Sequence, residues 1–304
     1  MIKISVVIPT HNRSKLLRRC LRSLSHQNFD KDKFEVIVID DASNDDTAQV
    51  VKKFQYEKFF TLNYLRLEKK LGVAAARNLG IKHAKGEIVA FTDSDCILSK
   101  NWLKNICMYY ARSEDIFAIE GRIVNALKRN RFAFTEQKIN EYCRNFITYS
   151  NSSNIFIVDF NTANCSIKKE AIDIYQLSFD KKFFVAEDAD FRNQLLQNSI
   201  KILYISKILV AHFHRADPIS FIKQNFYRGI GEHLLESKWN FNKRAIEKTY
   251  YDEKKAVVYF FLQFLKIEGG IKGLILFLIY ILRKAIRTLG YLVEKNRIFL
   301  FKLY

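Results

Sequence analysis

Acidic side chains behind apolar runs are the residues of this sequence best suited to chemistry. The segment IVAFTDSDC leaves a predicted strand in Asp93, Ser94 and Asp95, an Asp-x-Asp triplet. Mg²⁺ and Mn²⁺ prefer oxygen ligands, and proteins commonly hold them with one or two carboxylates and the phosphates of a substrate. Such triplets also arise by chance, but an earlier strand ends in a second acidic pair, Asp40 and Asp41. We therefore expect a metal site that handles a phosphate-bearing substrate.

The pair Asp40 and Asp41 allows two interpretations. Adjacent carboxylates repel each other, and the hydrogen-bond donors of a nucleobase edge or a ribose would relieve that repulsion. Alternatively, either residue caps the helix that follows. The first predicted strand also ends in polar residues, namely Thr10, His11, Asn12 and Arg13. Because ligands bind outside the carboxyl ends of parallel strands, both clusters are expected to line one crevice.

A third cluster is GVAAARNLG, whose alanines allow a helix to pack closely and which places Arg77 and Asn78 to contact phosphate or ribose. Further along, FVAEDADF puts Glu187 and Asp188 at a predicted helix start. There the acids either complement the helix dipole, or Asp188 acts as the general base for an acceptor hydroxyl.

Two histidines follow a later predicted strand in the segment VAHFHRADP. His212 and His214 are two residues apart, so in an extended segment their side chains point in opposite directions. At most one of them faces the metal, and the sequence does not decide which. A histidine here is more often structural, but beside an Asp-x-Asp triplet it is a plausible third ligand.

Alternating strands and helices position these residues. Apolar runs predict strands at Ile4–Ile8, Val36–Ile39, Leu62–Leu65 and Ile88–Phe91, and helical spacing predicts helices between them and at 102–110. This alternation predicts an α/β fold with a parallel sheet and right-handed crossovers. Further strands are expected at 117–119, 155–160 and 202–205, with a helix at 188–197, and loops or a covering helix over 129–154.

The chain is expected to contain a catalytic domain over residues 1–220 and a helical, basic and apolar extension over 221–304. Two apolar segments, Ala256–Leu265 and Gly273–Leu282, are each about half the length that spans a bilayer. They favour an interfacial or re-entrant helical hairpin, and the alternative is two core helices or a dimer interface.

Charge and composition restrict the partners. The formal net charge is +18, and residues 221–304 contribute +9 of it, interleaved with apolar stretches. This interleaved pattern favours an anionic membrane surface. Nucleic acid is disfavoured separately, because acids at three strand or helix ends would repel a polyanion unless a metal intervened. Five scattered cysteines and an N-terminus without a signal-like pattern favour the cytoplasm, with the protein peripheral at the inner face of the membrane.

The ordered motifs resemble the family 2 glycosyltransferases over residues 3–232. They are SVVIPTHNR, IVIDDAS, GVAAARNLG, FTDSDC, NTANCSIKKE, FDKKFFVAEDADF, HFHR and QNFYRGIGE. The resemblance implies the GT-A fold, a Rossmann-like, mostly parallel sheet flanked by helices. It also implies Mn²⁺ or Mg²⁺ and inverting transfer from a nucleotide-diphosphate sugar, commonly a UDP-sugar, to a hydroxyl of a saccharide or lipid-linked acceptor in polysaccharide or glycolipid synthesis.

The resemblance assigns roles to individual residues. It implies that Asp41 reads the nucleobase, in a pocket also lined by Pro9, His11 and Arg13. Asp93 then lies near the ribose, and Asp95 and His212 bind the metal. Asp188, beside Glu187, takes the place of the catalytic base.

Two departures from the family pattern qualify this interpretation. His11 stands where an aromatic residue is frequent, and YRGIG lacks the Gln-x-x-Arg-Trp pattern of processive members, so a single transfer is expected. The alternatives are a magnesium-dependent phosphatase, whose Asp-x-Asp usually follows the first strand rather than the fourth, and a catalytically inactive basic protein that binds membranes or RNA.

Overall fold

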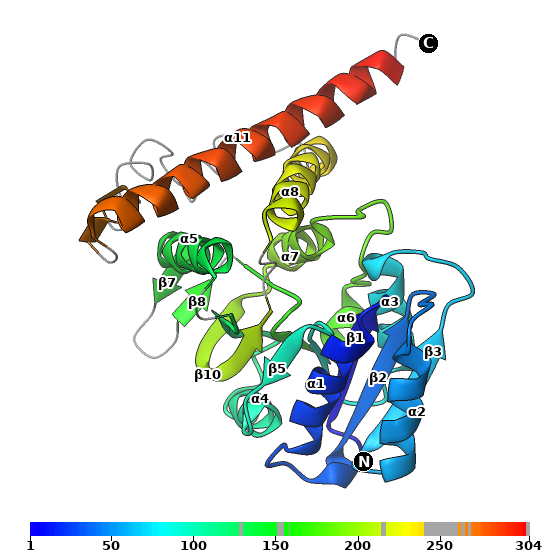
Figure 1. The fold of residues 1–304 in the computed structure, drawn as a ribbon. Helices are drawn as coiled ribbons and strands as arrows, with labels where there is room; N and C mark the ends of the chain where they lie inside the picture. Colours follow the sequence, from blue (N-terminus) through cyan, green and yellow to red (C-terminus); the bar gives the residue numbers. More distant parts are fainter. Residues whose placement is uncertain are drawn as a thin grey trace. The chain divides into compact units, whose positions relative to one another are not determined.

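The computed structural model describes residues 1–127, 130–150, 155–157, 159–213, 217–239, 261–262, 265–266 and 269–301. Within these residues ten strands form one sheet, in the order β3-β2-β1-β4-β9-β6-β10-β8-β7, with β5 paired to β10 (Figure 1). The strands are β1 (Ile4–Thr10), β2 (Phe34–Asp40), β3 (Thr61–Arg66), β4 (Ile88–Phe91), β5 (Cys96–Leu98), β6 (Ala118–Asn125), β7 (Thr148–Ser150), β8 (Ile155–Ile157), β9 (Cys165–Lys168) and β10 (Ile202–His212).

The helices alternate with the first strands and then dominate the end of the chain. They are α1 (Ser14–Ser25), α2 (Thr47–Glu57), α3 (Val73–His83), α4 (Trp102–Tyr110), α5 (Arg131–Ile147), α6 (Lys169–Ile174), α7 (Glu187–Gln197), α8 (Pro218–Trp239) and α11 (Gly270–Phe301), with a short 3₁₀ helix at Lys31–Lys33. The predicted helix at 188–197 is α7, and the segment for which loops or a helix were expected contains α5.

Side-chain alternation along the strands builds a core on each face of the sheet. In β1, Val6 and Ile8 face the core formed with α1, α2 and α4, whereas Val7 faces the core formed with α3, α6 and α7. All seven residues of β1 and of β2 are buried. Strands covered on both faces read as continuous apolar runs, which is why the sequence predicts them well.

The parallel pairs that the structure describes lie in the first half of the sheet. β1 pairs in parallel with β2 and β4, and β2 with β3. β9 is antiparallel to β4 and β6, and β10 is antiparallel to β5 and β8. The α/β class and the flanking helices are confirmed, while the antiparallel half was not anticipated.

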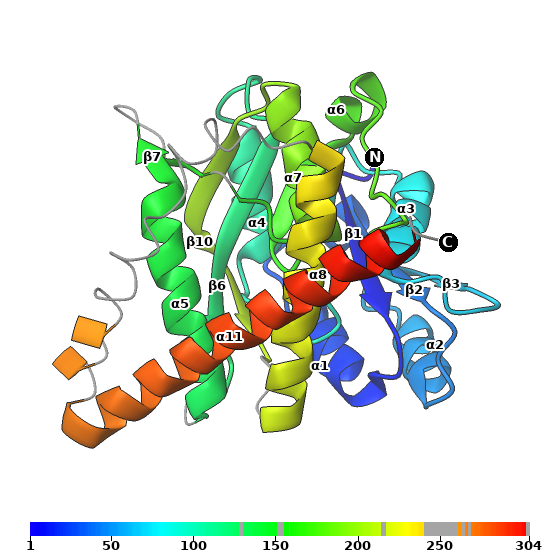
Figure 2. The same ribbon diagram turned by 90° about the horizontal axis from the view of Figure 1, so that it is seen from above.

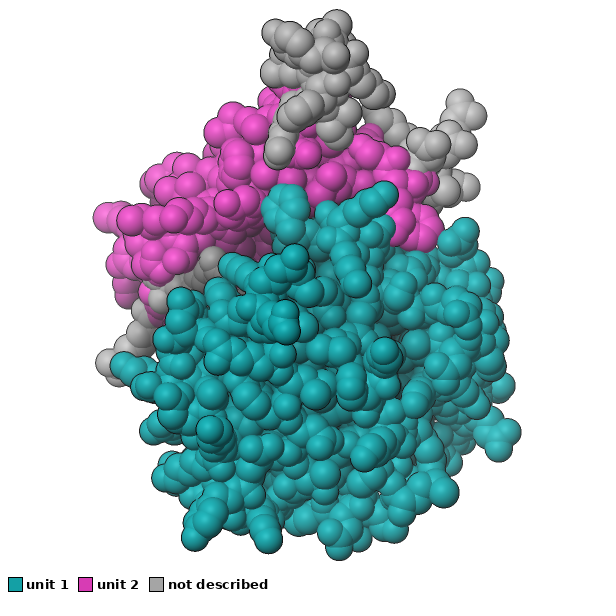
Figure 3. All heavy atoms as spheres, turned by 90° about the vertical axis from the view of Figure 1, so that its right-hand side faces the viewer, with its two compact units in different colours: residues 1–124, 149–213 teal, residues 125–148, 214–304 magenta. Residues whose placement is uncertain are grey.

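The described chain forms two compact units, coloured separately in Figure 3. Unit 1 comprises residues 1–124 and 149–213, and unit 2 comprises residues 125–148 and 214–304. The sheet core lies in unit 1, and α5, α8 and α11 lie in unit 2. The division of the chain into domains at residue 220 stays a prediction.

Two glycines let α8 and α11 approach closely within unit 2, where α11 runs across α8 (Figures 1 and 2). A Cβ atom on Gly229 of α8 would collide with the backbone oxygen of Arg287. Likewise, a Cβ atom on Gly290 of α11 would collide with the backbone oxygen of Phe226. The backbones therefore meet at a distance that only glycine permits.

A buried carboxylate joins three helices of unit 2, α5, α8 and α11. Glu136 of α5, 3% exposed, lies 2.7 Å from Nη1 of Arg228 on α8 and 3.0 Å from Nε of Arg283 on α11. Asn225 donates a further hydrogen bond to it at 3.3 Å. Burial alone would raise the pKa of Glu136, but the two arginines hold that pKa well below its ordinary value. The ion pairs thus fix how the helices of this unit pack.

The proposed C-terminal hairpin falls partly outside the described residues. Most of Ala256–Leu265 is not described, whereas Gly273–Leu282 lies within α11, a helix of 32 residues. The hairpin and its membrane contact stay predictions. Among the helices of the described ranges, none combines the length and apolar character that crossing a membrane requires.

We expect Gly290→Ala to destabilise unit 2 by about 1–3 kcal/mol, because the added methyl group forces the two helices apart. Thr288→Ala on the exposed side of the same helix is the matched control and should change stability by less than about 0.5 kcal/mol. Urea denaturation followed by circular dichroism measures both. Equal stability of the two variants would contradict the close helix approach.

Candidate active site

The ends of three parallel strands bring the predicted polar clusters to one edge of the sheet. Thr10 lies opposite Asp40 in the register of β1 and β2, and Val7 lies opposite Phe91 in the register of β1 and β4. The backbone N–H of Asp41 donates to the oxygen of Thr10 at 2.9 Å. The Asp-x-Asp triplet follows β4 directly, so it emerges at the same edge.

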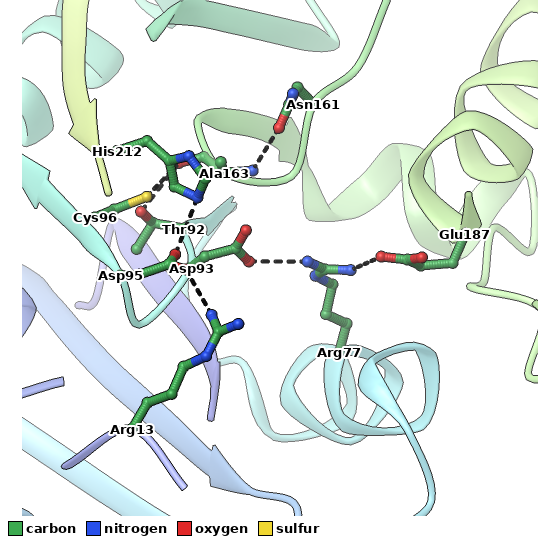
Figure 4. Close-up of polar contacts among 10 residues, drawn as sticks. All are labelled: Arg13, Arg77, Thr92, Asp93, Asp95, Cys96, Asn161, Ala163, Glu187 and His212. Atoms are coloured by element: carbon green, nitrogen blue, oxygen red, sulfur yellow. Dashed lines mark hydrogen bonds and ion pairs between the residues drawn. The ribbon is translucent and has the colours of Figure 1, made fainter. Parts of the chain in front are cut away.

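Asp95 is the meeting point of three distant segments (Figure 4). Its Oδ2 accepts a hydrogen bond from Nη1 of Arg13 at 2.5 Å, and its Oδ1 lies 3.1 Å from Nε2 of His212. Burial would raise the pKa of this carboxyl, but His212 and Arg13 outweigh burial and lower it to about 2. Burial would equally lower the pKa of His212, yet Asp95 raises it. Asp95 is therefore ionised, and its charge favours the protonated form of the His212 ring.

The ladder between β5 and β10 places His212 at Asp95. His212 lies opposite Cys96 in this antiparallel register, and the N–H of Phe213 donates to the backbone oxygen of Asp95 at 2.9 Å. The sequence left open which of the two histidines approaches the triplet. The structure places His212 there, and His214 lies outside the described residues.

Arg77 is a buried bridge between the triplet and α7 (Figure 4). It is 2% exposed, and its Nη2 lies 2.9 Å from Asp93 while its Nη1 lies 2.6 Å from Glu187. The guanidinium also lies 5.5 Å from the ring centre of Phe179. Burial would lower the pKa of Arg77, but the two carboxylates raise it, so the residue is a permanent cation. Its predicted contact with phosphate or ribose stays a prediction.

Asp188 lies at the start of α7, next to the bridged Glu187. The backbone N–H of Ala189 donates a hydrogen bond to Oδ1 of Asp188 at 2.8 Å. Burial, then the charges of Glu187 and Asp159, raise the pKa of Asp188 to about 7, although Arg77 opposes them. The side chain keeps partial exposure to solvent. A carboxyl with a pKa near neutrality is suited to accept a proton.

Neither Asp40 nor Asp41 caps α2. Asp40 accepts hydrogen bonds from the N–H of Ser43 at 2.8 Å and from the hydroxyl of Tyr64 at 2.5 Å. The carboxylate of Asp41 accepts from the N–H groups of Leu71 and Gly72 at 2.6 and 2.9 Å. The capping alternative is therefore wrong, and nucleobase recognition by Asp41 stays a prediction.

The remaining predicted pocket residues lie at the ends of β1 and β4. The ring Nδ1 of His11 lies 2.7 Å from the backbone oxygen of Asp41. Thr10 and Ser94 are buried, and Oγ1 of Thr10 lacks a hydrogen-bond partner. Pro9 lies opposite Ile39 in the parallel register of β1 and β2.

Three residues of this edge hold a left-handed backbone without being glycine. Asn12 has φ 51°, Ala42 has φ 59° and Ala186 has φ 62°. Ala186 immediately precedes α7 and so orients Glu187 and Asp188. Left-handed residues with a Cβ are strained, and such strain gathers at functional sites.

The chemistry of the donor set fits a divalent cation. Among the described residues, Asp95, Cys96 and His212 present potential ligand atoms within 4.8 Å of one another. Oδ1 of Asp95 is buried and lies 3.1 Å from Nε2 of His212, so a carboxylate oxygen and a ring nitrogen converge on one point. Burial raises the pKa of the Cys96 thiol well above its usual value, so Asp95 and His212 are the better ligands for a hard metal ion.

One neighbour of the site, Asp159, was not singled out from the sequence, and Arg13 makes a contact that was not expected. Asp159 acts electrostatically on Asp188, and Arg13 was expected in a nucleotide pocket rather than on the Asp95 carboxylate. Asp159 lies inside the predicted strand at 155–160, next to its last residue, and this position near a strand end was its available signal. The structure brings together Arg13, Asp95 and His212, and separately Arg77, Asp93 and Glu187.

A mixed α/β sheet that carries acidic side chains at the carboxyl edge of its parallel strands places the chain among the α/β proteins with a ligand site at that edge. The model of the glycosyl transferase family 2 matches residues 5–173. The chain therefore belongs to glycosyl transferase family 2. This membership separates it from the phosphatase alternative.

Curated relatives agree with the family. The chain is 32% identical over 208 residues to the poly(ribitol-phosphate) beta-N-acetylglucosaminyltransferase TarS of Staphylococcus aureus, covering 68% of this chain and 34% of TarS. The chain thus spans about a third of the length of TarS. It is 26% identical over 304 residues to a dolichyl N-acetyl-alpha-D-glucosaminyl phosphate 3-beta-D-2,3-diacetamido-2,3-dideoxy-beta-D-glucuronosyltransferase of Methanococcus voltae, covering 96% of this chain and 88% of that protein.

Solved structures share the fold. The mannosyltransferase PcManGT of Pyrobaculum calidifontis, determined with GDP-Man and Mn²⁺, superposes with a TM-score of 0.68 at 15% identity, covering 96% of this chain and 86% of that one. Residues 1–349 of S. aureus TarS, determined with UDP-GlcNAc, give a TM-score of 0.55 at 20% identity, covering 97% and 91%. At these identities the likeness concerns the fold alone, and it confirms the predicted GT-A-like architecture.

We expect Arg77→Ala to lower the free energy of unfolding by about 3–5 kcal/mol, because it leaves two carboxylates without their buried cation. Arg77→Lys, the matched control, keeps the charge but cannot contact both carboxylates through separate nitrogens. Its loss of unfolding free energy should therefore be smaller than that of the alanine variant. Urea denaturation measures both values. A loss below about 1 kcal/mol for the alanine variant would show that the bridge does not hold the edge together.

Proposed function

We propose that the protein is an inverting glycosyltransferase that moves one sugar from a nucleotide-diphosphate sugar, a UDP-sugar, to a hydroxyl of a saccharide or lipid-linked acceptor. The product belongs to polysaccharide or glycolipid synthesis. The single observation that carries the proposal is the placement at one edge of an anionic Asp95 beside His212 and of Asp188 with its pKa raised to about 7. The GlcNAc transfer in the name of TarS and its complex with UDP-GlcNAc support the choice of donor.

Asp95 and His212 would hold Mn²⁺ or Mg²⁺, which when bound supplies positive charge to the departing diphosphate. Arg13, within hydrogen-bond distance of Asp95, adds a fixed cation to the same region. Asp41, His11, Pro9, Thr10 and Ser94 are assigned to the nucleotide pocket. Asp93 is assigned to the ribose, and Arg77 supports this acid from behind through its ion pair.

Asp188 is the proposed general base. It takes the proton of the acceptor hydroxyl while the oxygen forms a bond to the anomeric carbon, and the bond from that carbon to the diphosphate breaks. A single displacement inverts the anomeric centre and needs no covalent enzyme intermediate. Glu187, tied to Arg77, holds the first turn of α7 so that Asp188 keeps its orientation.

The site of action is proposed to be the cytoplasmic face of a membrane, with the protein bound peripherally. The support is the basic and apolar character of residues 221–304, which carry a net charge of +9. Such a location would bring the site to lipid-linked acceptors.

The first test of this function is thermal stabilisation by ligands. UDP with Mn²⁺ or Mg²⁺ should raise the melting temperature by more than UDP or metal alone, because a bound divalent cation would offset the repulsion between the diphosphate and the carboxylates of the site. Asp95→Asn should lose this metal-dependent part, and Asp115→Asn on the surface should retain it. The same titration with GDP in place of UDP shows which nucleobase the site prefers. A chain that no nucleotide and metal stabilises would not be such a transferase.

The second test is the pH dependence of kcat. Asp188 must be deprotonated to act, so kcat should rise with pH up to about 7 and level off above it. Asp188→Asn should lower kcat by about 10²–10⁴-fold with donor affinity nearly unchanged, and the exposed Asp173→Asn serves as its control. A variant at Asp188 that keeps full turnover would remove this residue from the base role.

The same shift affects stability with a definite sign. The folded pKa of Asp188 is raised from 3.8 to about 7, so the fold favours the protonated form. Its contribution to stability is therefore present at low pH and decreases as the pH rises between these values. Asp188→Asn should remove this decrease, which urea denaturation at two pH values measures.

A further inference from the structure

One face of α11 exposes a long row of large apolar side chains. Ile271 is 79% exposed, Leu278 is 58% exposed and Leu289 is 55% exposed. The other members of this row, here called the α11 apolar face, are Leu274, Ile281, Leu282, Leu292 and Val293. At 100° per residue they fall within about one third of the helix circumference and extend over about 33 Å. Surface rows of this size indicate an interaction site.

The opposite side of α11 is already occupied within unit 2. Leu276 and Tyr280 are buried, Arg283 pairs with Glu136, and Gly290 lies against the backbone of α8. A helix held in this way along its length can offer a partner only its outer side. The partner must therefore lie alongside the helix axis.

The charge of α11 selects the partner. Between Gly270 and Phe301 the sequence contains six lysines and arginines and a single acid, Glu294. By helical spacing, Lys272 lies beyond one margin of the apolar face, and Lys284 and Lys295 lie beyond the other. Long basic side chains at both margins of an apolar stripe match an anionic lipid headgroup layer, with the apolar residues at the acyl boundary.

A second copy of the chain fits this surface less well. Two such faces would bring two strongly basic helices together, and like charges at the margins repel. We propose that the α11 apolar face is a docking surface for an anionic membrane, on which the helix lies in the plane of the headgroups. This inference deepens the proposed membrane location by naming the surface and its lipid class. Binding itself requires no sugar transfer.

The test measures sedimentation of the full-length protein with vesicles of phosphatidylcholine, with and without phosphatidylglycerol. The protein should bind the anionic vesicles, and the double variant Leu278→Glu, Leu289→Glu should bind them at least about tenfold more weakly, because two apolar groups are replaced by anions. Tyr56→Glu, at an 87% exposed position of unit 1, is the control and should bind as the unaltered protein does. Lys272→Glu with Lys295→Glu should weaken binding to the anionic vesicles only.

Binding that is absent, equal on both vesicle types, or unaffected by the double variant would overturn the proposal. Dimerisation in sedimentation velocity that the double variant abolishes, without vesicle binding, would assign the face to a second copy instead. Stabilisation by UDP and metal, measured on the same variants, checks that they are folded. It also separates failure of membrane docking from failure of the transferase function.

Discussion

A single buried cation, Arg77, is the interaction on which the acidic edge of unit 1 depends. Its partners Asp93 and Glu187 come from segments nearly a hundred residues apart, and the buried guanidinium would be unfavourable in the protein interior without them. The planar guanidinium forms an ion pair with one carboxylate through each of its two terminal nitrogens, which a lysine with a single nitrogen cannot do. It thereby joins the end of β4 to the start of α7, the two elements that carry the proposed donor site and the proposed base.

The parts of the fold that the sequence predicts are those with a simple periodicity. β1, β2 and β4 are continuous apolar runs because helices cover both faces of the sheet. The long β10 was expected only over 202–205, because Ser206 and Lys207 interrupt its apolar run and its continuation depends on pairing with β5. The antiparallel half of the sheet likewise rests on pairings between distant segments, which short-range patterns do not encode.

The candidate site was predictable in its residue types more than in its contacts. Acids behind strands locate the edge, since strand ends are visible in the sequence. Which charges meet depends on tertiary packing, so the approach of Arg13 to Asp95 and the burial of Arg77 had no local signal. Similarly, the choice between capping and another partner for Asp41 required knowing that the loop at Leu71 and Gly72 folds back onto it.

The left-handed alanine before α7 sets a limit on how far this enzyme can be made more robust. Ala186→Gly would relieve about 1 kcal/mol of backbone strain at this left-handed residue. It would also allow a wider range of φ and ψ values at the residue that precedes α7. The orientation of Glu187 and Asp188 would then become less certain. At this position, lower backbone strain and a fixed orientation of the two acids therefore require different residues. Alanine keeps the orientation and retains the strain.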